Sequence, residues 1–210
     1  MSHRLMLCGA ACAAALLVLP LSGRSQEKEK KGGEAMQSAE MDAMMKKWME
    51  AATPGEPHKK LNDMVGSWQT TMRSWMNGTD GEPNVSKGTA EVQWILGGRY
   101  LEQKMKGEMM GMPFEGYGFN GYDNINKKYV GIWMDNSSTG VFLTEGTLSK
   151  DGKVLTMIGK MDDVVTGEHD KPMKYVHRFL SKDKQAFEFH DLSLPEGKTK
   201  VGEIEYIRTK

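Results

Sequence analysis

The order of apolar and polar residues divides the chain into three parts. Leu5 to Leu21 is an almost unbroken apolar run that follows Arg4. Met36 to Ala52 repeats apolar residues at helical spacing, and Thr53-Pro54-Gly55 ends that pattern because proline cannot continue a helix. From Gly66 onward, short apolar-rich runs alternate with turn residues about every ten positions, as in a meander sheet or barrel. The pattern therefore predicts one amphipathic helix followed by an all-β domain.

Ten strands are predicted in the second part of the chain. They lie near residues 67–75, 87–96, 99–107, 114–122, 128–134, 140–149, 153–161, 173–181, 186–192 and 199–208. Gly97-Gly98 and Asp151-Gly152 are predicted to form hairpin turns, because these dipeptides accept positive φ angles. The strands do not alternate with helices, which favours an antiparallel arrangement. An open sheet of this size would leave exposed edges, so we expect a single closed antiparallel meander barrel of about ten strands.

The apolar run at the N-terminus has the layout of a secretory signal peptide. Arg4 supplies its positive charge, and the small residues Ser22, Gly23 and Ser25 follow the run. The run is short for a membrane span, which needs about 20 residues. We therefore predict a cleaved signal and an exported protein, periplasmic or extracellular. The predicted domains are a signal peptide (1–25), a flexible polar linker (26–35), an N-terminal helical segment (36–60) and the barrel (61–210).

Charge and cysteine content exclude several classes of partner and chemistry. The chain has 28 basic and 28 acidic residues, a balance that disfavours nucleic acids and anionic membranes as partners. Cys8 and Cys12 are the only cysteines, and both lie in the predicted signal. The exported chain would therefore have neither a disulfide nor thiol chemistry, and its stability must come from its core.

A series of short blocks resembles a known family. The blocks are Val65-Gly66-Ser67-Trp68, Leu96-Gly97-Gly98-Arg99-Tyr100, Gly116-Tyr117-Gly118, Gly121-Tyr122-Asp123, Trp133-x-Asp135, Thr166-Gly167 and Glu205-Tyr206-Ile207-Arg208. In this order, from Leu61 to Lys210, they resemble the secreted bacterial domain-of-unknown-function family 1579. The resemblance implies export from a bacterium and carries no particular reaction with it.

The opening Gly66-x-Trp68 is also similar to the first strand of the calycin barrels, which include lipocalins and fatty-acid-binding proteins. In that group an arginine from the last strand packs across the tryptophan of the first. The resemblance therefore implies that Trp68 and Arg208 close one end of the barrel. A guanidinium can stack on an indole and still donate hydrogen bonds to nearby carbonyls, so this role is structural rather than catalytic.

Aromatic residues on the predicted strands point to an interior binding site. Some of them must face inward in any closed barrel, and an apolar interior with a few polar groups is the usual site for a small molecule. Trp133 is a candidate for the aromatic wall, and Arg99, Asn120 and Tyr122 are candidates for the polar part. A filled barrel without a cavity is the alternative.

His177 and His190 are the candidate metal or haem ligands. With a turn centred on Asp183-Lys184, the two side chains would face each other with Cβ atoms about 5 Å apart. Two imidazoles and the carboxylate of Glu188 would suit a metal, and one axial histidine would suit a ferric haem. The spacing fixes no third ligand, so we favour a half-exposed polar pair on the outer face. Both histidines are kept as candidate ligand-binding residues. We expect no bound metal and no cofactor.

Methionine is abundant, at 18 of 210 residues. Met41, Met44, Met45 and Met49 share a helical stripe with Trp48. Thioethers suit Cu(I), but a helix that packs through an apolar face explains the same spacing. We therefore keep Cu(I) only as an alternative.

The sequence favours binding over catalysis. Asp123, Asp135 and Asp162-Asp163 lie at predicted turns, where aspartate is favoured because it bonds the local backbone. The leading hypothesis is non-catalytic binding of a small, partly apolar ligand. The alternatives are a structural or stress-related cell-envelope interaction protein with a filled barrel, and a protein that binds Cu(I) or haem. Enzymatic activity is left open and is disfavoured.

Overall fold

The computed structural model describes residues 25–75, 79–163 and 166–209, with side-chain environments from residue 36 onward. Residues 1–24, which hold almost all of the predicted signal peptide, lie outside this part. The chain divides into two compact units, Met1–Lys47 and Trp48–Lys210. The elements in chain order are α1 (Ser25–Ala52), α2 (Glu56–Lys59), a 3-10 turn η1 (Asn62–Met64), β1 (Gly66–Ser74), β2 (Asn84–Ile95), β3 (Tyr100–Met109), β4 (Met112–Asp123), β5 (Lys128–Asp135), β6 (Phe142–Leu148), β7 (Val154–Met161), β8 (Lys171–Ser181), β9 (Lys184–Asp191) and β10 (Lys200–Arg208).

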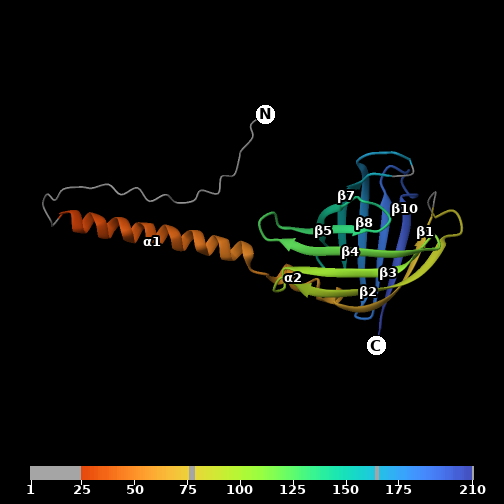
Figure 1. Cartoon of the computed structure of the whole chain (residues 1–210), viewed down its shortest axis with the longest axis horizontal. Coiled ribbons are helices and arrows are strands. Elements are labelled where there is room, and N and C mark those ends of the chain that lie inside the picture. The colour runs from red at the N-terminus through yellow and green to blue at the C-terminus, as the bar shows by residue number, and fades with distance from the viewer. Residues whose placement is uncertain (1–24, 76–78, 164–165, 210) are drawn as a thin grey trace. The chain divides into compact units, whose positions relative to one another are not determined.

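The ten strands form one closed antiparallel barrel (Figure 1). Each strand pairs with its neighbours in sequence, and β1 pairs with both β2 and β10. Closure gives hydrogen-bonding partners to the two strands that would otherwise be edges. The predicted all-β meander barrel is thus confirmed, and each of the ten predicted strands has its counterpart.

The two predicted glycine turns are centred where the sequence places them, but both loops are longer than two residues. Ile95 pairs with Tyr100, so the β2–β3 loop has four residues instead of the two predicted. Leu96, Gly97 and Gly98 all adopt positive φ angles, which is why the pairing stops before Leu96. The register set by Gly97-Gly98 is nevertheless the predicted one.

Residues between α1 and β1 close one end of the barrel. Leu61 is fully buried, and His58 and Met64 are nearly so. This segment is tied to β2 and β5 by two hydrogen bonds. Trp94 Nε1 donates to Asn62 Oδ1 at 2.8 Å, and Tyr129 Oη donates to the Pro57 carbonyl at 3.1 Å. We call this end of the barrel the closed end.

Trp68 and Arg208 meet at the closed end, as the calycin resemblance implies. The two residues are cross-strand partners between β1 and β10, and the guanidinium carbon lies 4.1 Å from the centre of the indole. The guanidinium also donates to the carbonyls of Val65 (2.6 Å), Lys182 (2.8 Å) and Asp63 (3.1 Å). Arg208 thereby joins β10, the β8–β9 turn and the chain that enters β1.

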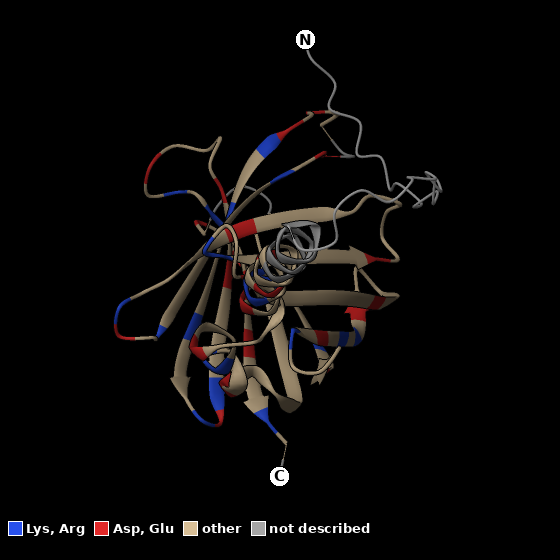
Figure 2. Ribbon diagram, turned by 90° about the vertical axis from the view of Figure 1, so that its left-hand side faces the viewer, with Lys and Arg blue, Asp and Glu red and all other residues tan. Residues whose placement is uncertain are grey.

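Charged residues of both signs are interspersed around the strands and turns (Figure 2). This mixture fits the neutral charge balance of the sequence. No helix in the described ranges combines the length and apolar character that a membrane span requires.

The helix α1 differs from its prediction in two ways. It begins at Ser25, so residues 26–35 are helical where the sequence predicts a flexible linker. Their glutamates and lysines have high helix propensity, which outweighs the two glycines there. The stripe predicted to pack, formed by Met41, Met44, Met45, Trp48 and Met49, is 47–66% exposed.

Candidate ligand-binding cavity

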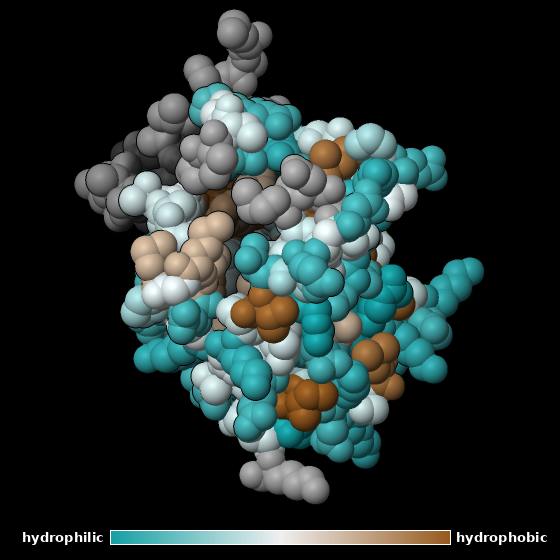
Figure 3. Space-filling model, turned by 90° about the vertical axis from the view of Figure 1, so that its right-hand side faces the viewer, coloured by the Kyte–Doolittle hydropathy of each residue, from teal (hydrophilic) through white to brown (hydrophobic). Residues whose placement is uncertain are grey.

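The barrel encloses a cavity of about 400 Å³. Met64, beside the closed end, lines its floor. Ser86, Met109 and Phe142 line it near the opposite end, where β2 and β6 begin and β3 finishes. Figure 3 shows a hollow in the surface with hydrophobic residues in its depth. The predicted alternative of a filled barrel therefore does not describe this interior.

Glycines on the inner face make room for large side chains. A Cβ atom on Gly116 or Gly118 would lie 2.3 or 2.9 Å from atoms of the Trp133 indole. The indole therefore lies directly against β4, and its Nε1 donates to Asp135 Oδ2 at 2.8 Å. The blocks Gly116-x-Gly118 and Trp133-x-Asp135 thus form one unit, in which the glycines accept the ring and the aspartate orients it.

The walls of the cavity are dominated by methionine and aromatic side chains. Methionine is unbranched and polarisable, so it adapts to irregular ligand shapes, and aromatic rings offer flat apolar surfaces. The methionines are Met64, Met72, Met105, Met109, Met157, Met161 and Met173, and the aromatic residues are Phe114, Trp133, Phe142, Tyr175, His177, Phe187, Phe189 and Tyr206.

His177 is the titratable group buried most deeply in this wall. It is 5% exposed, and its ring stacks with Phe179 and Tyr206 at centroid distances of 4.8 and 6.0 Å. Its Nε2 lies 2.6 Å from Gln185 Oε1. Burial lowers the pKa of His177 to about 4, because the surrounding rings do not solvate a charged imidazole. His177 is therefore neutral at physiological pH.

Several other polar groups in the cavity are uncharged. Gln103 Nε2 donates to Tyr206 Oη at 3.3 Å, and burial raises the pKa of Tyr206 to about 12. Asn120 and Thr70 also line the cavity, and their side chains have no hydrogen-bond partner among the described residues. They add uncharged hydrogen-bonding groups to the cavity wall.

Three of the predicted ligand-binding residues line the cavity and three do not. Asn120, Trp133 and His177 line it. Arg99 lies in the β2–β3 turn, where its guanidinium donates to the Leu96 carbonyl at 3.0 Å. Tyr122 packs at the closed end against Tyr129 and His58, at centroid distances of 5.0 and 5.9 Å. The methionine and phenylalanine walls were missed, although their alternation along the strands is a usable signal.

The predicted pairing of His177 with His190 is wrong. His177 pairs with Phe187, and His190 pairs with Lys174. The β8–β9 register is displaced from the predicted one and includes an irregularity between Phe179 and Ser181. An odd displacement moves a residue to the other face of a strand, so the two histidines lie on opposite sides of the wall. They form neither a two-imidazole metal site nor a polar pair on the outer face.

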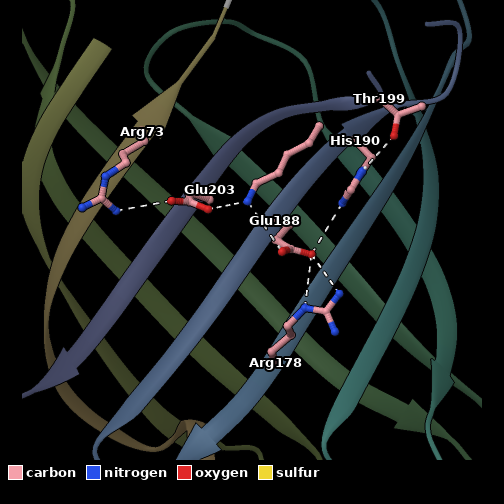
Figure 4. A network of polar contacts seen from close by, with 7 residues as sticks. Arg73, Arg178, Glu188, His190, Thr199 and Glu203 are labelled. Atoms are coloured by element: carbon pink, nitrogen blue, oxygen red, sulfur yellow. Dashed lines mark hydrogen bonds and ion pairs between the residues drawn. The ribbon is translucent and has the colours of Figure 1, made fainter. Parts of the chain in front are cut away.

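His190 instead belongs to a polar network on the outer face of β1 and β8–β10 (Figure 4). Its Nδ1 lies 3.1 Å from Thr199 Oγ1, and its Nε2 lies 3.6 Å from Glu188 Oε2. Glu188 also pairs with Arg178, at 3.2 Å. Within the described ranges, no group of three or more His, Cys, Asp or Glu side chains is placed to hold a metal.

The aspartates proposed for turns act there as predicted. Asp123 accepts hydrogen bonds from the backbone amide and the side chain of Asn126, at 3.0 and 2.6 Å, and from the Ile125 amide at 2.7 Å, and these bonds lower its pKa. Asp135 Oδ1 accepts from the Ser137 amide at 2.9 Å. These contacts organise turns and do not pair two carboxylates for acid–base chemistry.

The fold and cavity define a class, the closed lipocalin-like barrels with an internal cavity. Within that class the chain belongs to the family described as "Protein of unknown function (DUF1579)", whose model matches residues 53–208. This confirms the resemblance that the sequence blocks carry. No curated protein matches the sequence.

Solved structures support the fold. Rv2717c from M. tuberculosis is 12% identical, with a TM-score of 0.54 over 75% of this chain and 100% of that chain. The S-type phycobiliprotein lyase CPES from Guillardia theta is 11% identical, with a TM-score of 0.50 over 77% of this chain and 96% of that chain. At these identities the likeness establishes a shared barrel architecture only.

Proposed function

We propose that the barrel binds a small, largely apolar molecule in its cavity without catalysing a reaction. The observation that carries this proposal is the enclosed space of about 400 Å³ with methionine and aromatic walls. Well-formed apolar pockets with a few convergent polar groups are the usual sites of small ligands. The unpartnered side chains of Asn120 and Thr70, both within the described ranges, add such polar groups.

The test uses N-phenyl-1-naphthylamine, an uncharged fluorescent probe that brightens in apolar surroundings. Titration of the purified protein should give saturable fluorescence. Met157→Trp, which fills part of the cavity, should weaken binding at least about tenfold, because the added ring occupies the space of the probe. Ile158→Trp is the matched control, since Ile158 is the next residue of β7 and is exposed. Circular dichroism should establish that both variants fold.

Two results would contradict the proposal. One is the absence of saturable binding by the unmodified protein. The other is equal binding by the folded Met157→Trp and Ile158→Trp variants, because the probe would then lie outside the barrel.

We further propose that the protein acts after export, in the periplasm or outside the cell. The apolar run after Arg4 and the confinement of both cysteines to the first 12 residues support this proposal. N-terminal sequencing of the protein from its native host should find the mature chain beginning after Gly23 or Ser25. A chain that retains its first 20 residues in the cytoplasm would contradict it.

A further inference from the structure

Gln185 fixes the tautomer of His177. Gln185 Nε2 donates to the backbone carbonyl of Asp63 at 2.5 Å, and a carbonyl can only accept. The other end of the amide, Oε1, therefore faces His177 Nε2 at 2.6 Å. That oxygen also can only accept, so Nε2 carries the proton. In the neutral imidazole, Nδ1 then holds a lone pair and no proton.

The lone pair of Nδ1 is available to a guest in the cavity. His177 lines the cavity, and its Nδ1 has no hydrogen-bond partner among the described residues. His190 Nε2 is the one fully enclosed side-chain polar atom without a hydrogen-bond partner in that part of the chain, so His177 Nδ1 keeps contact with open space. Phe179 and Tyr206 stack with the imidazole, and Phe187 makes a T-shaped contact with it at 5.7 Å, so a guest can reach only the remaining part of the ring edge.

The charges around the cavity disfavour an anionic guest. Two lysines, Lys87 and Lys106, touch the cavity. Successive residues of a strand point to opposite faces, and the neighbours of both lysines face inward. These neighbours are Ser86 and Gly88 in β2, and Met105 and Gly107 in β3. The lysines therefore lie at the rim rather than inside. The carboxylate of Asp135 also lines the cavity. An anion in the interior would be desolvated without a cation to pair with it, which is costly.

We propose that the cavity selects uncharged apolar molecules that carry a hydrogen-bond donor, such as an alcohol, a phenol or an arylamine, and that His177 Nδ1 accepts their hydrogen bond. This inference rests on the proposed function of the barrel as a ligand-binding site. It distinguishes the protein from a carrier of fatty-acid anions, which would need a cation in the interior. His177 is thus the residue that determines specificity.

The test compares three ligands of nearly equal shape by calorimetric titration at neutral pH. They are 2-naphthol, which donates, 2-methoxynaphthalene, which does not, and 2-naphthoate, which is anionic. The unmodified protein should bind 2-naphthol about 3- to 10-fold more tightly than 2-methoxynaphthalene, the range for one net hydrogen bond. It should bind 2-naphthoate most weakly.

Two variants test whether His177 causes the preference for 2-naphthol over 2-methoxynaphthalene. His177→Phe should bind 2-naphthol and 2-methoxynaphthalene with nearly equal affinity, whatever its absolute affinity for either. His190→Phe is the matched control on the outer face of the same hairpin and should retain the preference. Nitrogen NMR of the unmodified protein gives a readout that needs no variant. It should show a proton on Nε2 alone, and the Nδ1 resonance should move with 2-naphthol but not with 2-methoxynaphthalene.

The outcomes separate this inference from the proposed function. Equal affinity for 2-naphthol and 2-methoxynaphthalene, or tightest binding of 2-naphthoate, would overturn the inference and leave the barrel a binding protein. A Soret shift with haemin that disappears in His177→Phe would also overturn it, because iron would then use the lone pair. Failure of all three naphthalenes and the naphthylamine probe to bind would overturn the proposed function itself.

Discussion

Arg208 joins several segments of the chain at the closed end of the barrel. Its guanidinium stacks on Trp68 and donates to three carbonyls from two other chain segments. Lysine has one ammonium group and cannot reproduce this planar fork. The Asp63 carbonyl is shared between Arg208 and Gln185, so closure is also coupled to the polar group behind His177.

Arg208→Lys should lower the free energy of unfolding by about 2–3 kcal/mol, because two or more carbonyls lose their charged donor. Urea unfolding followed by tryptophan fluorescence measures this change. Arg73→Lys is the matched control. Its contact with Glu203, at 3.3 Å, is partly exposed, and such pairs contribute about 0.5 kcal/mol or less. Equal losses in the two variants would refute the closing role of Arg208.

Gly66 is required by the same arrangement. Its φ of +132° is unfavourable for residues with side chains, and a Cβ atom there would lie 2.2 Å from Arg208 Nη1. Gly66→Ala should therefore lower the unfolding free energy by at least about 2 kcal/mol. Gly81→Ala should have little effect, because a Cβ atom at Gly81 meets no atom within 4 Å. Thermal melts of both variants test this contrast, which would fail if Gly66→Ala were as stable as Gly81→Ala.

Sequence reasoning at this scale succeeds where one residue has one physical role. Gly66, Trp68 and Arg208 form a short motif whose geometry follows from the calycin resemblance. The contact of Gly116 and Gly118 with Trp133 could not be predicted in this way, because it joins two strands and depends on their register. The burial of His177 was missed for the same reason.

At the scale of elements, strands are predicted well and their registers less well. The alternation of apolar residues and the turn dipeptides locate all ten strands. Gly97-Gly98 also fixes the β2–β3 register, because glycine tolerates the positive φ angles of that turn. The β8–β9 turn has no glycine, and its strands include an irregularity, so the sequence misplaces the register and reverses the face of His190 relative to His177.

The division into two compact units predicts that the barrel folds without the first 47 residues. Residues 48–210 form one compact unit that retains the contacts of Asn124 with the carbonyls of Ala51 and Thr53. The residues before 48 belong to a separate compact unit, so we expect the barrel to fold without them. A chain of residues 48–210 should therefore melt within about 2 °C of the chain that starts at residue 26. A fall of about 10 °C would show that α1 stabilises the barrel.

At the scale of the whole molecule, the buried histidine makes stability depend on pH. The folded-state pKa of His177 is about 4, below the ordinary value of 6.5, so the unfolded chain binds more protons between these values. Stability from His177 is therefore present in full above pH 6.5 and declines as pH falls toward about 4. Burial also lowers the pKa of His58 and His190, which act in the same direction.

Urea unfolding at about pH 7.5 and about pH 5 measures this dependence. The unmodified protein should lose about 2 kcal/mol from His177 alone between these values, because a tenfold difference in proton affinity between the folded and unfolded chains corresponds to about 1.4 kcal/mol. His177→Phe should lose about 2 kcal/mol less over the same interval, whatever its stability at neutral pH. The comparison within each protein cancels any packing cost of the substitution. An equal loss in both proteins would mean that His177 is solvated or charged in the folded barrel, and the neutral acceptor inferred for the cavity would then be absent.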